Sequence, residues 1–202
     1  MFVTKAMKYF YSTVIALLSA LTVGAQCLQT IPFTENFDGS AWTVSPTTTG
    51  IGTIDPCWTR ISNPVTGYEW ATGPPTFPSG FTGAQSDHTT GTGKYMYTNF
   101  TGFGTPPLNA RFESPEISLV GSTSPELIFW YHMFGSGIGD LKAQVNAGNG
   151  WINLQTITGQ QQTSSTSSWT SSTLSLSAYV GDTVRVRFWL PAQDLARLLE
   201  YV

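Results

Sequence analysis

The sequence has 202 residues, with nine Lys and Arg against twelve Asp and Glu, and a formal net charge of −3. Only 10% of the residues are charged and 13% are aromatic, which argues against an intrinsically disordered chain. No run of Lys and Arg is present to hold phosphates, which argues against nucleic acids and anionic membrane surfaces as partners.

The N-terminal segment, residues 1–25, predicts a secretory signal peptide. Lys5 and Lys8 precede an apolar run that extends to about Val23, and small residues lead to Ala25. A membrane anchor is the alternative, because the run approaches the ~18 apolar residues of a membrane span. Cleavage after Ala25 would leave enough chain for one domain with a sizeable core. We therefore expect a secreted or cell-surface protein whose mature domain does not insert into the membrane.

Cys27 and Cys57 are the only cysteines, and both follow the predicted signal peptide. Outside the cell they can oxidise to a disulfide. Closing the loop between them would stabilise the fold by about 3 to 4 kcal/mol. A two-cysteine metal site is the alternative, but no C-x-x-C occurs and the nearest histidine in the sequence is His88. We expect a structural disulfide.

The middle of the chain predicts loops and strands in alternation. Stretches rich in Pro, Gly and Thr at 44–56 and 72–84 are predicted loops, and residues 94–99 are a predicted strand. The run LIFWYHMF, residues 127–134, is apolar at almost every position. This pattern predicts a central strand that is buried on both faces.

The C-terminal half predicts a hairpin and a further strand. Residues 141–147 and 151–157 surround a glycine turn, which is typical of a hairpin, and the polar stretch 160–173 is a predicted hairpin connection. In residues 183–188, two Val and one Phe alternate with two Arg, so one face is predicted core and the other solvent-facing. Short strands at this spacing indicate a β-sandwich or jelly roll.

The stretch SDHTTGTGKYMYTN, residues 86–99, places Asp87 beside His88 and raises the question of catalysis. The other histidine, His132, is predicted to pack on its strand, and no H-E-x-x-H or G-x-S-x-G motif occurs. Glu35 and Asp38 are three residues apart, so on an ideal strand they would point to opposite faces, unlike the facing carboxylates of a glycosidase. The sequence therefore predicts a domain that is not an enzyme.

Glu35, Asp38 and Asp87 suit calcium binding better than catalysis. Calcium takes six to eight oxygen ligands, and these carboxylates would contribute if the segment around Glu35 lay beside the Asp87 loop. The alternative for Asp87 is a turn cap whose side chain accepts backbone N–H groups.

The tryptophans have two interpretations. They are expected mainly in the core, although a platform for stacking sugars is the alternative. The residues concerned are Trp42, Trp58, Trp70, Trp130, Trp151 and Trp169.

Taken together, these blocks resemble the MAM domain, the extracellular module of meprins, neuropilins and mu-type receptor phosphatases that also occurs in secreted bacterial proteins. The matching residues run in family order over about residues 27–188. They are FTENFD from Phe33, Cys57-Trp58, Trp70, DHTTGTGKYMY from Asp87, ARFESPEI from Ala110, LIFWYHMFGSGIGDLKAQV from Leu127, Trp151, the segment 160–169 and VRVRF from Val184.

The resemblance implies an all-β, concanavalin-like jelly-roll β-sandwich of two antiparallel sheets without catalytic activity. It supports the pair Cys27–Cys57 and favours a structural calcium held by Glu35, Asp38 and Asp87. The domain is expected at residues 26–190. Residues 191–202, with a short amphipathic helix predicted from residue 194, do not resemble the family's last strand, which indicates a truncated or frame-shifted end.

Two functions follow from the resemblance and the composition. The first is a non-catalytic extracellular adhesion or interaction module whose partner is a protein or a glycan at the cell surface. The second is a carbohydrate-binding module once appended to a secreted hydrolase or peptidase, which only the jelly-roll class and the tryptophans support.

Overall fold

The computed structural model describes residues 27–44, 50–62, 68–74, 82–100, 109–135 and 138–191. The predicted signal peptide and the helix expected from residue 194 lie outside these ranges. The described residues form eleven strands and one short 3-10 helix. Among these residues, no helix has the length and apolar character needed to cross a membrane.

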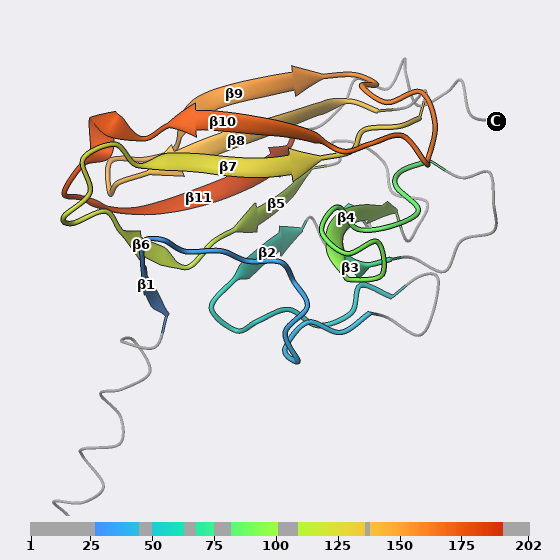
Figure 1. The fold of residues 1–202 in the computed structure, drawn as a ribbon, viewed down its shortest axis with the longest axis horizontal. Helices are drawn as coiled ribbons and strands as arrows, with labels where there is room; N and C mark the ends of the chain where they lie inside the picture. Colours follow the sequence, from blue (N-terminus) through green and yellow to red (C-terminus); the bar gives the residue numbers. More distant parts are fainter. Residues whose placement is uncertain are drawn as a thin grey trace, which may run out of the picture.

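The strands are short and follow one another along the whole described chain (Figure 1). They are β1 (Leu28–Thr30), β2 (Thr59–Ser62), β3 (Tyr68–Gly73), β4 (Tyr95–Phe100), β5 (Ala110–Glu113), β6 (Glu116–Ser118), β7 (Glu126–Tyr131), β8 (Asp140–Asn146), β9 (Ile152–Thr158), β10 (Thr170–Ser175) and β11 (Thr183–Leu190).

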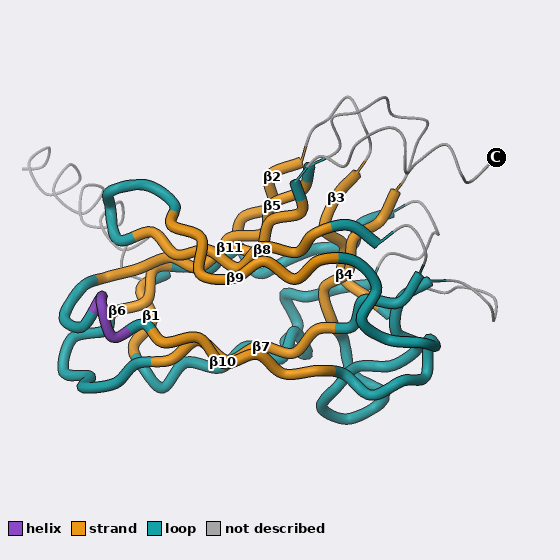
Figure 2. Tube along the Cα trace, turned by 90° about the horizontal axis from the view of Figure 1, so that it is seen from above, coloured by secondary structure: helices purple, strands orange, loops and turns teal. Residues whose placement is uncertain are grey.

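The strands pack as two layers, which confirms the predicted all-β sandwich. One layer has the order β1-β6-β11-β5-β2, and β8 joins it by pairing with both β11 and β9. The other layer holds β7 paired with β10 (Figure 2), and β3 pairs with β4 as a separate ribbon. The named strand pairs are antiparallel except β1 with β6, which is parallel.

The hairpin and the strand predicted between residues 141 and 188 are confirmed. β8 and β9 form the expected hairpin, with a register shift between Ala143 and Gln144. On β11, Val184 and Val186 are buried, whereas Arg185 on the other face is exposed. The polar stretch from residue 160 connects β9 to β10 as expected, and its last residues, from Thr170, form part of β10 itself.

The interpretation of residues 127–134 as a strand buried on both faces is wrong. β7 ends at Tyr131, and its exposure alternates along the strand. Leu127 and Phe129 pack toward the core, whereas Ile128 is 59% exposed and Trp130 is 46% exposed. The apolar sequence does not mean burial here, because β7 also has large apolar side chains on its outward face, and nothing in the described chain covers them fully.

The core lies between the two layers and is rich in aromatic rings. Phe129 of β7 meets Phe188 of β11 edge to face at 4.9 Å between ring centroids, so this contact joins the layers. Phe112 of β5 is 1% exposed and stacks on Trp58 at 4.7 Å. Trp42 is 2% exposed and packs against the same Phe112. The expectation that tryptophans fill the core therefore holds for this end of the sandwich.

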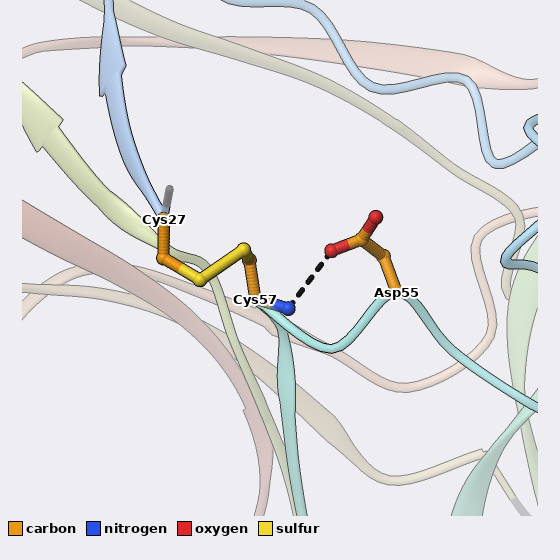
Figure 3. The surroundings of a disulfide bond; sticks show 3 residues. All are labelled: Cys27, Asp55 and Cys57. Carbon is orange, nitrogen blue, oxygen red and sulfur yellow. Dashed lines mark hydrogen bonds between the residues drawn. A yellow bond between two sulfur atoms is a disulfide. The ribbon is translucent and has the colours of Figure 1, made fainter. Parts of the chain in front are cut away.

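The predicted disulfide between Cys27 and Cys57 is present, with a Cα–Cα distance of 5.1 Å and a sequence separation of 30 (Figure 3). It ties the residue before β1 to the residue two before β2. The backbone N–H of Cys57 also donates a hydrogen bond of 2.8 Å to Asp55 Oδ1. β1 pairs with β6 and β2 pairs with β5, and both β6 and β5 pair with β11, so the bond joins two segments that lie along the same edge of the sheet.

Replacing both Cys27 and Cys57 with Ala should lower the free energy of unfolding by about 3 to 4 kcal/mol, because the unfolded chain regains the freedom of the closed loop. Urea titration under non-reducing conditions measures the change. Reduction of the unmodified protein should produce a loss of the same size, and a loss below about 1 kcal/mol in both experiments would contradict the expectation.

Candidate functional site

A dense network of hydrogen bonds lies in the corner loop, which we define as residues 85–94, just before β4. The carboxylate of Asp87 is 6% exposed and organises this loop. Its Oδ2 accepts hydrogen bonds from the N–H of Thr89 (2.8 Å) and of Thr90 (2.7 Å). Its Oδ1 accepts from the N–H of Gly93 at 2.7 Å and from the hydroxyl of Thr90 at 3.1 Å. Asp87 is therefore a turn cap.

These hydrogen bonds stabilise the ionised form of Asp87. Burial alone would raise the pKa of the carboxyl, because a charge loses its hydration in the interior. The bonds from Thr90, Gly93 and Thr89 outweigh burial, and the pKa lies below its ordinary value. The loop consequently contains a fixed negative charge at neutral pH.

A second carboxylate reaches the same loop from a distant part of the chain. Asp38 Oδ1 accepts a hydrogen bond of 2.8 Å from the backbone N–H of Lys94, and the Lys94 ammonium donates to the Asp38 carbonyl at 3.2 Å. The adjacent Phe37 has a φ of 64°, a left-handed conformation that a non-glycine residue adopts at a cost in energy. This conformation coexists with an edge contact of 4.9 Å between the rings of Phe37 and Trp42.

Gly93 allows the two carboxylates to meet. Asp87 Oδ1 binds its N–H, and a Cβ atom at this position would lie 2.7 Å from Asp38 Oδ1 and 2.9 Å from Asp38 Oδ2. Any side chain here would therefore force Asp38 away. The segment around Asp38 therefore lies beside the Asp87 loop, which was the condition for these carboxylates to act together, and the glycine at position 93 makes the approach possible.

Glu35 does not join these two acids directly. It lies in an irregular segment, and its Oε1 accepts a 2.7 Å hydrogen bond from the N–H of Phe37. Burial raises the pKa of Glu35, the Phe37 bond opposes the rise, and the charge of Asp55 adds to it. Among the described residues, no three His, Cys, Asp or Glu side chains gather in a way that could hold a metal ion.

His88 does not act with Asp87 as an acid–base pair. Its ring stacks on the ring of Trp130, with 3.6 Å between centroids and an interplanar angle of 18°. The carboxylate of Asp87 is occupied by the N–H groups of its own loop. The pairing of His88 with β7 was not predicted, because nothing in the sequence connects residues so far apart.

Stacking of His88 produces a mixed aromatic and apolar surface, which we call the β7 face: Ile128 and Trp130 of β7 with His88 over Trp130. Opposite these two β7 residues in the register stand Thr173 and Ser171 of β10, so hydroxyl groups border the apolar side chains. A patch of exposed large apolar side chains that is surrounded by polar groups is typical of recognition surfaces.

The connection after β9 anchors the corner loop from the other side. The N–H of Gln85 donates to the Ser165 carbonyl at 3.1 Å, and Trp169 Nε1 donates to the Ser86 carbonyl at 3.0 Å. Gln162, 5% exposed, accepts a hydrogen bond from the N–H of Met133 at 2.5 Å. Composition alone could not identify this buried glutamine within a polar, Ser- and Thr-rich stretch.

Comparison with known proteins shows what this arrangement is similar to. Residues 55–191 match the family described as MAM domain, meprin/A5/mu. Neuropilin-1a of Danio rerio is 36% identical over 112 residues, which cover 53% of this chain and 12% of that protein. The chain therefore corresponds to a small part of the curated relative.

Replacing Asp87 with Asn should lower the free energy of unfolding by about 2 to 3 kcal/mol at pH 7, because the amide places donor hydrogens against backbone N–H groups. Since the folded pKa is lowered, the contribution of Asp87 is fully present above the ordinary value of 3.8 and is lost as pH falls through the folded pKa. The difference between the two proteins should therefore shrink below about pH 4.

Urea titrations between pH 2.5 and pH 7 test this expectation. Asp182→Asn is the matched control, because it removes the same charge from an exposed turn. An equal loss in both variants, or a gap that stays constant at acidic pH, would count against the role of Asp87.

Proposed function

This chain belongs to the MAM domain family, and we propose that it is a non-catalytic adhesion or interaction module of a secreted or cell-surface protein. The family and the neuropilin relative support an extracellular role in binding. The Cys27–Cys57 disulfide supports it as well, because such bonds persist in oxidising compartments.

The β7 face is the observation that carries the proposal of a protein partner. Ile128 and Trp130 are about half exposed on adjacent outward positions of one strand. The stack with His88 holds Trp130 in place, so binding would cost less side-chain freedom. Tryptophan is enriched among the residues that dominate binding energy in protein interfaces.

The calcium prediction stays a prediction, with Glu35, Asp38 and Asp87 as its ligands. A concentration of negative charge supports it. The carboxylates of Asp38 and Asp87 approach each other at Gly93, and burial together with the nearby charge of Asp55 raises the pKa of Glu35. The arrangement requires Glu35 to leave the Phe37 N–H and carbonyl oxygens of the loops to complete the coordination.

If calcium binds the folded state, the melting temperature should be higher in millimolar calcium than in a chelator. At a calcium concentration of a hundred times Kd, binding should raise the free energy of unfolding by about 2.7 kcal/mol. Asp38→Asn should abolish the gain, and Glu126→Gln, an exposed carboxylate on β7, should keep it. Identical melting curves for the unmodified protein with calcium and with chelator would refute calcium binding.

Ile128→Ser and Trp130→Ala should each weaken binding to a protein partner at least about tenfold, as expected for central interface residues. Fluorescent beads that carry the full chain measure this on intact cells of the source organism. Val120→Ser is the matched control, because Val120 is 69% exposed in the turn between β6 and β7 and is not a member of the β7 face.

Protease treatment of the cells should remove bead binding, whereas removal of surface glycans should leave it. Loss of binding only after glycan removal would instead favour the carbohydrate-binding function. Equal binding by the Trp130→Ala and Val120→Ser variants would exclude the β7 face as the contact surface.

A further inference from the structure

The outward face of the larger sheet contains a group of cationic and aromatic side chains, on the side of the sandwich away from the β7 face. We call it the basic-aromatic cluster. Its members are Arg111 on β5, Lys142 on β8, Arg187 and Trp189 on β11, and Trp151 just before β9. They point outward because their strand neighbours Phe112, Ala143 and Phe188 pack inward.

Strand register creates the cluster. Trp189 pairs with Arg111 on one side and with Lys142 on the other, so a ring stands between two cations in one row across three strands. The Arg111 guanidinium lies 5.9 Å from the centre of the Trp189 ring, and the Lys142 ammonium lies 5.1 Å from it. Arg187, in the next row, lies 4.2 Å from the centre of the Trp151 ring.

Positive charge in the cluster exceeds the negative charge available to it. Glu113 Oε1 lies 3.6 Å from Arg187 Nη1, and a further ion pair on this sheet joins Arg185 Nε to Glu116 Oε1 at 3.9 Å. Arg111 and Lys142 form no ion pair among the described residues. This excess is local, because the chain as a whole has a net charge of −3.

The contacts within the cluster leave like charges close together and some N–H donors without a hydrogen-bond acceptor. Burial lowers the pKa of Arg187, and the like charge of Arg111 lowers it further, whereas Glu113 opposes both. Within the described part of the chain, Arg111 Nε and Trp189 Nε1 are enclosed without a hydrogen-bond partner. Repulsion between neighbouring cations is costly, and an anionic ligand beside Arg111 and Arg187 would relieve it.

We propose that the basic-aromatic cluster binds an acidic polysaccharide that carries carboxylate or sulfate groups. The guanidinium of Arg111 would hold such a group through paired N–H donors, and the Lys142 ammonium would add a second charge. The indoles of Trp189 and Trp151 would pack against the C–H faces of the sugar rings.

The shape of the cluster favours a linear polysaccharide. Outward positions along β11 recur about every 6.7 Å, and neighbouring strands lie about 4.8 Å apart, so the partly exposed cations and rings are spaced at regular intervals across the sheet. Arg185, Arg187 and Trp189 occupy three successive outward positions of one strand. A chain of repeating acidic sugars presents its charges at regular intervals along such a surface.

Binding of the full chain to immobilised glycans tests the proposal. Heparin supplies sulfates, alginate supplies carboxylates, dextran is the neutral control and poly-glutamate is the acidic peptide. We expect saturable binding to heparin or alginate that weakens between 50 and 300 mM salt, and no binding to dextran. Which of the two acidic glycans binds more tightly identifies the anionic group.

The double variant Arg111→Gln with Lys142→Gln should weaken glycan binding at least about tenfold while the protein stays folded, since neither side chain forms an ion pair among the described residues. Lys94→Gln is the matched control, because Lys94 lies in the corner loop and contacts the backbone of Asp38. Absence of binding, equal binding to dextran, or equal effects of the two sets of variants would overturn the proposal. Poly-glutamate binding as tight as glycan binding, with the same sensitivity to the variants, would also overturn it.

Discussion

The carboxylates of Asp38 and Asp87 hold together the corner on which the β7 face depends. Both accept backbone N–H groups of the Gly93–Lys94 step, although they come from segments 49 residues apart in the chain. Without this step the corner loop would lose its connection to the segment around Phe37. His88 leaves the same loop to stack on Trp130, so a polar network in the interior positions an aromatic group at the surface.

The sandwich presents two outward faces with different chemistry. The β7 face is apolar with hydroxyl groups beside it, whereas the basic-aromatic cluster on the opposite layer combines cations with indole rings. Both depend on strand alternation, since each outward side chain has inward neighbours in the core. One jelly-roll scaffold therefore carries two surfaces of different chemistry, to which we assign the proposed protein and glycan contacts, because function belongs to surface sites rather than to the fold.

Prediction from the sequence succeeded where the signal was local and periodic. The β8–β9 hairpin and the alternation in β11 follow from turn residues and period-two patterns, and they are confirmed. It failed for β7, because an apolar run does not reveal which face the second layer covers. The stack of His88 on Trp130 and the burial of Gln162 were also missed, since each depends on a partner far away in the chain.

The sequence by itself determined the all-β class, the cysteine pair, the family and the turn chemistry of Asp87 with its glycines, because these depend on composition, spacing and local hydrogen bonding. Only the tertiary structure decided which carboxylates meet, which tryptophans are exposed and where positive charge accumulates. Arg111, Lys142 and Arg187 are scattered along an acidic chain, and pairing of three strands brings them together around one ring. Such proximity is a consequence of register, which no single segment encodes.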